Sequence, residues 1–101
     1  MTPQEQAIHE TRQSVYGPWY ENMAGTSQQL SGLITQMLSN GAATYTDGKF
    51  TLPDWAAALF MATAYKGNRI ASGNFHADNF IDCAVYADMV KQMQKMESEE
   101  K

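Results

Sequence analysis

The side chains best suited to chemistry lie between Lys66 and Tyr86. Lys66 and Arg69 are one helical turn apart, ahead of a loop at Ser72-Gly73-Asn74. After the loop come further polar residues, most of them at helical spacing: His76, Asp78, Asn79, Asp82 and Tyr86. Residues three, four or seven positions apart share one face of a helix. Because the chain folds back at the loop, we expect the two cations to face the two aspartates.

Two interpretations of this cluster stay open. In the structural one, the two cations pair with Asp78 and Asp82 and join two antiparallel helices, and such ion pairs mainly set geometry. In the functional one, the cations hold a phosphate or carboxylate, while the aspartates take ribose hydroxyls, an amine or a divalent metal ion. Two carboxylates are a sparse donor set for Mg²⁺, which takes six oxygen ligands.

The two histidines have different expected roles. His76 precedes Asp78 by two residues, so it is either a cap and hydrogen-bond partner in the loop or a ligand contact. His9 is predicted to be a surface residue of the first helix. These histidines and Cys83 show no metal-ligand spacing, so we expect no His/Cys metal site. No phosphate-binding glycine loop or nucleophile elbow is present, and no catalytic residue is predicted.

A second polar and aromatic cluster comes early in the chain. It comprises Arg12, Tyr16, Trp19 and Asn22, interrupted by Gly17-Pro18. Aromatic residues at a helix junction often act as core wedges. Alternatively, Tyr16, Trp19 or the adjacent Tyr20 stacks on a planar base while Arg12 and Asn22 supply polar contacts.

Composition narrows the functional classes. The chain has 101 residues, a formal net charge of −4 and a single cysteine. One domain is expected over residues 1–101. The acidic balance without a basic run argues against nucleic-acid binding. No apolar stretch is long enough to span a membrane, and the first residues lack a signal-peptide pattern, so a cytoplasmic protein is expected.

Helix signals and apolar spacing predict an all-α fold of about four helices in a bundle. Thr2 caps a first helix from Pro3 to about Tyr16, and a second runs from Trp19 to about Asn40, with a weak point at Gly25-Thr26-Ser27. Asp47-Gly48 marks a small hairpin that must lie on the helices or on a neighbouring chain.

The sequence pattern of the second half of the chain predicts two more helices. Residues 55–65 are apolar nearly all round, so the helix predicted over residues 55–71 is the buried central one. The Thr51 to Asp54 segment before it repeats the helix-start chemistry of the first helix. Asp78 begins or caps the last helix, and residues 96–101 form a loose tail. The core stripe of the last helix is predicted to consist of Ile81, Ala84, Val85, Met89 and Met93. The methionines are expected to fill the core or a subunit interface, and the apolar helix faces favour a homo-oligomer.

The chain resembles a family of small uncharacterised phage and prophage proteins. The resemblance covers roughly residues 12 to 90 and rests on R…YG…N, KxxR and HxDNxxDxxxY elements. These are Arg12, Tyr16-Gly17, Asn22, Lys66, Arg69, His76, Asp78-Asn79, Asp82 and Tyr86. It implies a viral origin, a host-cell cytoplasmic location and a helical fold.

A more distant resemblance is to the all-alpha nucleotide pyrophosphohydrolases. Their metal cage uses E-x-x-E on one helix and E-x-x-D on the next, whereas residues 55–71 here contain no acidic residue. This departure speaks against hydrolysis by that mechanism and leaves binding without turnover open.

Together these features favour a phage-encoded binder of a phosphorylated, nucleotide-type small molecule that sequesters a host immune signal. Lys66 and Arg69 would hold the phosphate, Asp78, Asn79 and Asp82 would take polar groups, and Tyr16 or Trp19 would stack. One alternative is an interaction module that inhibits a host enzyme through an acidic or aromatic surface. Another is a divergent Mg²⁺-dependent nucleotide hydrolase.

Overall fold

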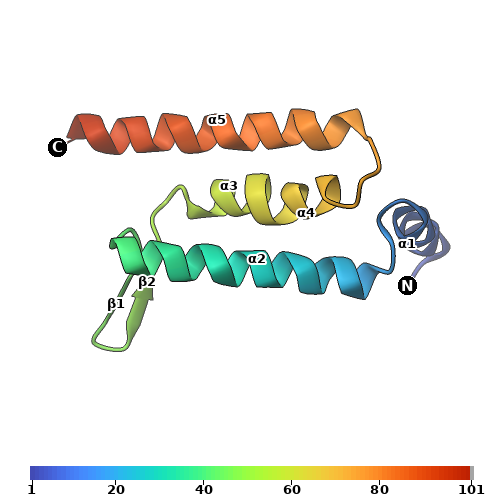
Figure 1. Ribbon diagram of the computed structural model, residues 1–101, viewed down its shortest axis with the longest axis horizontal. Coiled ribbons are helices and arrows are strands. Elements are labelled where there is room, and N and C mark those ends of the chain that lie inside the picture. Colours follow the sequence, from blue (N-terminus) through green and yellow to red (C-terminus); the bar gives the residue numbers. More distant parts are fainter. Residues whose placement is uncertain (101) are drawn as a thin grey trace.

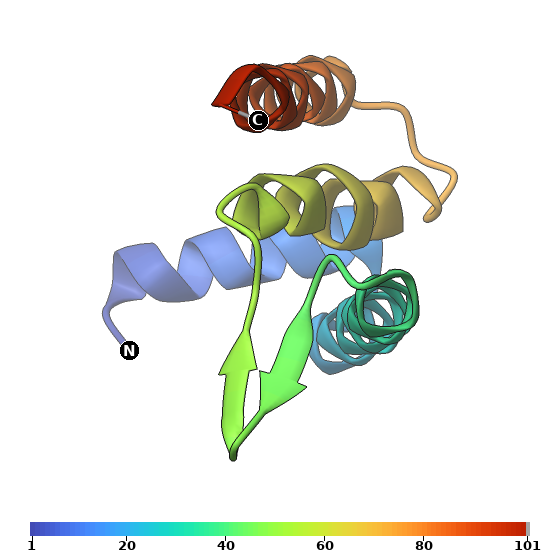
Figure 2. The ribbon, with the colours of Figure 1, turned by 90° about the vertical axis from the view of Figure 1, so that its left-hand side faces the viewer.

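The computed structural model describes residues 1–100 and has the predicted all-α architecture. Its helical elements are α1 (Pro3–Tyr16), α2 (Trp19–Asn40), α3 (Ala56–Phe60), the π-helical turn η1 (Met61–Tyr65), α4 (Lys66–Ile70) and α5 (Ala77–Glu100). The elements α3, η1 and α4 follow one another without a break and form the central helical segment, residues 56–70. This segment lies between α2 and α5 (Figure 1). Figure 2, in which α2 and α5 are seen end-on, shows α1 lengthwise, so α1 crosses one end of the stack.

The predicted ends of the first two helices are confirmed. The Thr2 hydroxyl accepts a hydrogen bond from the backbone N–H of Glu5 at 3.1 Å. Gly17 ends α1 at φ 84°, and Gly41 ends α2 in the left-handed conformation at φ 82°. A Cβ atom disfavours both backbone conformations, so these glycines fix where each helix stops.

Helix α2 runs without interruption through Gly25-Thr26-Ser27. A Cβ atom on Gly25 would lie only 2.7 Å from Oδ1 of Asn68. The Asn68 amide donates to the backbone oxygen of Asn22 at 2.9 Å, and also to its side-chain oxygen. The predicted weak point is therefore a place of close approach, where a missing side chain lets α4 pack against α2.

The central helical segment is buried mainly through small side chains, because Ala56, Ala62 and Ala64 are each at most 5% exposed. Its start was expected to use helix-capping chemistry around Asp54, but no side chain caps it. In η1 the Lys66 backbone N–H bonds to the carbonyl of Met61, five residues back, which is the π-helical pattern. This wider turn rotates α4 relative to α3 and so changes which residues face α2 and α5.

The hairpin consists of β1 (Thr44–Thr46) and β2 (Lys49–Thr51), with Tyr45 opposite Phe50. Asp47 and Gly48 both have positive φ, as the predicted two-residue turn requires. The strands are exposed along their whole length, so of the two predicted supports the helices do not cover them, and packing on a neighbouring chain stays a prediction. The base of the hairpin joins the core, where Ala43 packs with Met37, Ala56 and their neighbours Leu52, Trp55, Leu59 and Phe60.

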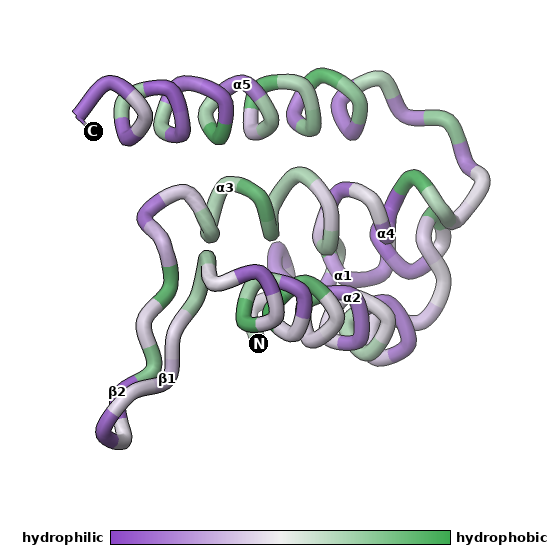
Figure 3. The backbone as a smooth tube through the Cα atoms, turned by 60° about the vertical axis from the view of Figure 1, so that its left-hand side comes forward, coloured by the Kyte–Doolittle hydropathy of each residue, from purple (hydrophilic) through white to green (hydrophobic). Residues whose placement is uncertain are grey.

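The predicted core stripe of α5 is wrong for most of its residues. Ile81 is 58% exposed, and Ala84, Val85 and Met89 are also exposed, while Met93 is half-buried. The face that packs on the rest of the protein carries Asn79, Asp82, Cys83, Tyr86, Val90 and Met93. Figure 3 shows that the N-terminal half of α5 is the more hydrophobic half, so an exposed apolar surface remains there. A homo-oligomer formed through it stays a prediction.

The C-terminal residues also differ from expectation. Helix α5 continues to Glu100, where a loose tail was predicted, and Glu97 accepts a hydrogen bond from the Trp55 indole at 3.2 Å. Lys101 lies outside the described residues. None of the helices within residues 1–100 is long and apolar enough to cross a lipid bilayer.

Candidate functional site

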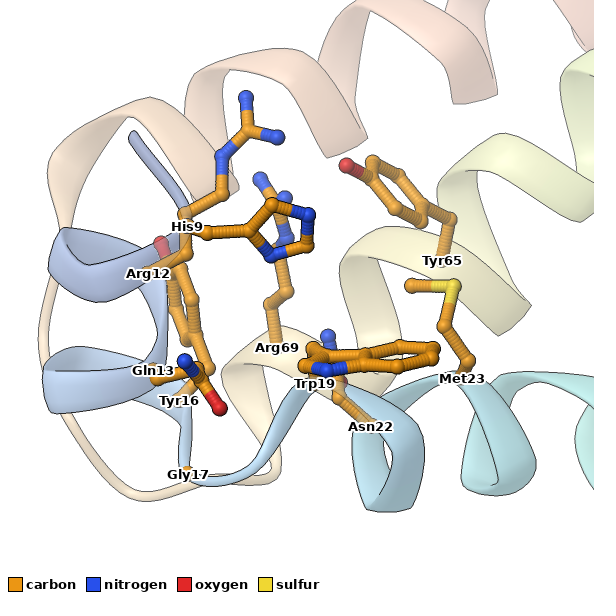
Figure 4. Close-up of a pocket in the computed structure, with 10 residues that line it drawn as sticks. All are labelled: His9, Arg12, Gln13, Tyr16, Gly17, Trp19, Asn22, Met23, Tyr65 and Arg69. Atoms are coloured by element: carbon orange, nitrogen blue, oxygen red, sulfur yellow. The ribbon is translucent and has the colours of Figure 1, made fainter. Parts of the chain in front are cut away.

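A pocket of about 340 Å³ lies where α1 crosses the start of α2 and the end of α4. Figure 4 shows the side chains arranged around it. Its ten lining residues are His9, Arg12, Gln13, Tyr16, Gly17, Trp19, Asn22, Met23, Tyr65 and Arg69. We call it the Arg69 pocket, because one arginine dominates its chemistry.

The Arg69 guanidinium is held by aromatic rings rather than by carboxylates. Its Cζ lies 4.4 Å from the centre of the Tyr65 ring and 4.9 Å from that of Tyr16. Among residues 1–100 its buried Nε has no hydrogen-bond partner, and no ion pair to Arg69 occurs there. Burying a charged donor without an acceptor is unfavourable. Arg69 therefore has unused capacity to bind an anion.

The charged side chains that line the pocket are basic. Arg12 joins Arg69 in its lining. No aspartate or glutamate lines it, although the chain as a whole carries a net charge of −4. This separation creates a local positive site on an acidic protein.

Aromatic residues give the pocket its shape. Trp19 lies at the start of α2, and the His9 ring meets it edge-on with 6.2 Å between ring centres. Tyr65 from η1 and Tyr16 from α1 lie to either side of the Arg69 guanidinium (Figure 4). These side chains come from three separate elements, so only the folded chain assembles the pocket.

A buried amide fixes the α1 wall of the pocket. Asn79 is 2% exposed, and its Nδ2 donates to the Tyr16 hydroxyl at 3.1 Å. The His76 ring lies 5.7 Å from the Tyr16 ring, and the Asn74 amide donates to the Val15 carbonyl. The first turn of α5 and the loop before it thereby hold the end of α1, which has no buried residue of its own.

Lys66 behaves differently from Arg69, although one helical turn separates them. Its Nζ lies 2.8 Å from Oδ2 of Asp82, and its side chain is 9% exposed, against 45% for that of Asp82. This is the ion pair between helices that the structural interpretation expects. It applies to Lys66 alone, because Arg69 turns toward the pocket and pairs with neither Asp78 nor Asp82.

The structure brings together five of the eleven residues predicted from sequence to bind a ligand. These five are Arg12, Tyr16, Trp19, Asn22 and Arg69. The other six do not line the pocket: Lys66, His76, Asp78, Asn79, Asp82 and Tyr86. Asn79 and His76 contact the pocket residue Tyr16 from outside, Asp78 is exposed, and Tyr86 lines a separate groove.

Four further lining side chains were missed by the sequence analysis: His9, Gln13, Met23 and Tyr65. The expectation that His9 is only a surface residue is wrong, because it is half-buried against Trp19. The helical spacing of His9, Gln13 and Tyr16 could have placed them on one face of α1. Tyr65 gave no such signal, because its orientation depends on the π-helical turn.

Within residues 1–100, no group of three or more histidine, cysteine, aspartate or glutamate side chains is placed to hold a metal ion. The geometry instead offers cationic and amide donors beside aromatic faces. In comparisons with known proteins, no family model, no curated protein and no solved structure matches this chain.

Proposed function

We propose that this protein binds a small phosphorylated molecule with a planar ring, of the nucleotide type, in the Arg69 pocket. The observation that carries the proposal is the Arg69 guanidinium, which is buried at Nε without an acceptor and lies between two tyrosine rings. A phosphate accepts two parallel hydrogen bonds from a guanidinium. Such a ligand would supply the acceptor that Arg69 lacks.

The pocket charges support an anionic ligand over a cationic or neutral one. Arg12 and Arg69 both line the pocket, and no carboxylate there competes for them. Arg12 is exposed, so it strengthens the attraction from the rim while Arg69 makes the deeper contact. Lys66, which the sequence analysis assigned to phosphate, is instead engaged by Asp82. Arg12 and Arg69 would therefore contact the phosphate in place of Lys66.

The aromatic and amide groups favour a planar ring next to the phosphate. Trp19 is 53% exposed beside the pocket, and a base stacking on it would cover much of that surface. The Asn22 side-chain oxygen already accepts from Asn68, which leaves the Asn22 amide N–H groups for a ligand oxygen or ring nitrogen.

The pocket volume favours a ligand with a single base. About 340 Å³ is near the lower end of the usual range of roughly 300–1,000 Å³ for small-molecule sites. A mononucleotide suits this space better than a dinucleotide does. Sequestration of a host immune signal by a phage-encoded protein would be one use of such binding.

A thermal-shift titration tests this proposal. The purified protein is heated with AMP, GMP, ADP-ribose or a cyclic dinucleotide, and separately with adenosine or inorganic phosphate alone, each with and without Mg²⁺. Selective binding to the folded state raises the melting temperature. We expect the mononucleotides to give the largest shift. We expect adenosine and phosphate to give small shifts, because each engages only half of the pocket.

Variants locate the binding in the Arg69 pocket. Arg69→Met should abolish the shift, and Arg12→Ala, which changes an exposed side chain, should reduce it while the protein stays folded. Lys91→Ala on α5 lies outside the pocket and serves as the control that keeps the full shift. If no compound shifts the melting temperature, or Lys91→Ala loses the shift as well, the proposal is wrong.

The two alternatives from the sequence differ in their support. Hydrolysis is not favoured by this geometry, because no carboxylate lines the pocket. It predicts Mg²⁺-dependent turnover that Asp82→Ala abolishes. The alternative of a protein-interaction module predicts that Arg69→Ala lowers the melting temperature without loss of any ligand. Two methionine-lined concavities with acidic side chains along α5 favour the protein-interaction module.

A further inference from the structure

A second concavity, of about 490 Å³, lies between the start of the central helical segment and the middle of α5. A smaller one of about 100 Å³ adjoins it at the end of α5 and shares Asp54 and Met93 with it. The α5 residues that line the larger one lie around the middle of that helix, and those that line the smaller one lie at its C-terminal end, which points away from α1 (Figure 1). Four of the seven methionines line the two concavities: Met61, Met89, Met93 and Met96. We call the two together the methionine groove.

The groove offers an adaptable apolar floor. Ala57 and Ala58 keep its α3 side shallow, while Met89 is 45% exposed and Met96 is 59% exposed. Methionine side chains are unbranched and polarizable, so they reshape around apolar partners and are common at protein-binding surfaces. The sequence predicted Met89 to be a core residue. The structure places it on an open face.

Acidic side chains surround this apolar floor. Asp54 and Asp88 line the larger concavity, and Glu97 and Glu100 line the smaller one. No lysine or arginine lines either. An apolar floor with carboxylates along its sides is complementary to a segment that carries apolar residues flanked by cations.

The dimensions favour a helical segment as the occupant. The stretch of α5 from Asp88 to Glu100 rises about 18 Å, at roughly 1.5 Å per residue. A partner helix of about three turns would span the same length, and the groove between two helices accepts the side-chain ridge of a third. Its i, i+3, i+4 and i+7 residues would meet the methionines, while its flanking residues would meet the carboxylates.

A second copy of this chain does not have that chemistry. The chain has only seven lysines and arginines against eleven acidic residues. On α5, Lys91 and Lys95 are close in sequence to Asp88, Glu97, Glu99 and Glu100. Docking two acidic grooves would also bring like charges together.

We infer that the methionine groove binds a basic amphipathic helix of a partner protein. Binding there does not depend on the Arg69 pocket, because the two sites share no lining residue. The groove is therefore the surface through which an interaction module of this fold would act.

A synthetic peptide tests the inference by fluorescence anisotropy. The labelled probe has about 14 residues, with leucines at i, i+3, i+4 and i+7 positions and lysines on the remaining faces. Two comparison peptides have the same composition in scrambled order, or glutamate in place of lysine. We expect the probe to bind the intact protein, the scrambled peptide to bind about tenfold more weakly, and the acidic peptide not to bind.

Protein variants assign the binding to the groove. The double variant Asp54→Lys/Asp88→Lys should weaken peptide binding about tenfold, and Met89→Asn should weaken it several-fold. The control Glu10→Lys/Glu21→Lys makes the same change in net charge on α1 and α2, away from the groove, and should change binding less than about twofold. No peptide binding, equal binding of the scrambled peptide, or an equal loss in the control variant would overturn the inference.

Discussion

The Arg69 pocket and the methionine groove are both concave and partly apolar, but their charges are opposite. The pocket has two arginines and no carboxylate, whereas the groove has four carboxylates and neither lysine nor arginine. Their lining residues come from different parts of the same helical stack: α1, the start of α2 and the end of the central helical segment for the pocket, and the start of that segment with residues 86–100 of α5 for the groove. Apolar lining alone does not separate the two proposed roles. The sign of the nearby charge favours an anionic ligand for the pocket and a basic partner for the groove.

The comparison also shows why a bulk charge is a poor guide to a small acidic protein. The net charge of −4 predicts that anions are repelled on average. Near Arg69, however, the interaction is with groups a few ångströms away, and more distant exposed charges are screened by salt within about 10 Å. A local cationic site can therefore exist on this chain without changing its overall acidic character.

The largest effect is expected when the binding of both ligands, the mononucleotide and the peptide, is measured on a variant of each site. Arg69→Met removes about two charge-assisted hydrogen bonds, worth about 3 kcal/mol or more together, so the mononucleotide affinity should fall at least about a hundredfold. Peptide binding at the groove should stay unchanged. Isothermal titration calorimetry of both ligands measures this.

The converse variant, Asp54→Lys/Asp88→Lys, should weaken peptide binding and leave the mononucleotide affinity as it was. If either variant impairs both ligands to the same degree, the two regions are not independent sites. Circular dichroism of each variant would show whether a loss of folding is responsible.

The next largest effect is expected on stability, at the ion pair between the two regions. Asp82→Asn leaves the buried Lys66 ammonium without its partner and should lower the free energy of unfolding by about 2 kcal/mol, less than for a fully buried pair because Asp82 is 45% exposed. Lys66→Met removes the buried charge itself and should cost less. Urea denaturation measures both values. An equal or larger loss in Lys66→Met would contradict this account of the pair.

Two glycines of α2 give a smaller, paired test. A methyl group on Gly25 meets Oδ1 of Asn68 at 2.7 Å, whereas one on Gly32 meets nothing within 4 Å. Gly25→Ala should therefore lower the free energy of unfolding by about 1 kcal/mol or more. Gly32→Ala should raise it by about 0.5–1 kcal/mol through better helix propensity. Thermal denaturation of the two variants checks the opposite signs.

Gly25→Ala also sharpens the contrast between the regions. Asn68 bonds to Asn22, which lines the Arg69 pocket, so displacing Asn68 should weaken mononucleotide binding. The groove shares no lining residue with the pocket and should bind the peptide as before. A peptide affinity that falls as much as the nucleotide affinity would speak against this local effect.

The smallest expected effect is a difference in salt dependence. The groove carboxylates Asp54 and Asp88 are exposed, while Arg69 is half-buried, and exposed charges are screened more strongly. Raising NaCl from low to physiological concentration should reduce peptide affinity a few-fold and mononucleotide affinity less. Titrations of both ligands at two salt concentrations measure the difference. A steeper loss for the nucleotide would contradict the assigned burial of Arg69.

Local signals in the sequence were sufficient for the helices and the hairpin turn. Thr2, Gly17 and Gly41 mark helix ends that the structure has at the same residues, and Asp47-Gly48 is the turn between the strands. Each of these depends on the backbone preferences of a few adjacent residues. The packing face of α5 was not predictable in the same way. Its apolar residues, such as Ile81, face solvent, while Asn79 is buried.

The candidate site was predicted only in part, because local spacing does not determine which distant helix a side chain faces. Residue types indicated that Arg12, Trp19 and Arg69 could bind an anionic planar ligand, but helical spacing alone placed Arg69 with Lys66 against the aspartates. The π-helical turn and the tyrosine rings direct Arg69 to α1 instead. A one-residue change in helical register rotates the following side chains by about a quarter of a turn, and no spacing rule applied to the sequence includes it.

By itself, the sequence determined the order of the elements, the ends of the first two helices, the tight turn of the hairpin, and a supply of cationic, aromatic and amide side chains. These depend on interactions between residues close in the chain. Only the tertiary structure decided which of these side chains meet. Lys66 pairs with Asp82, and the Arg69 guanidinium lies between the rings of Tyr16 and Tyr65. Met61, Met89 and Met93 line a surface groove. Such contacts depend on packing between helices distant in sequence, which the local pattern of one helix does not encode.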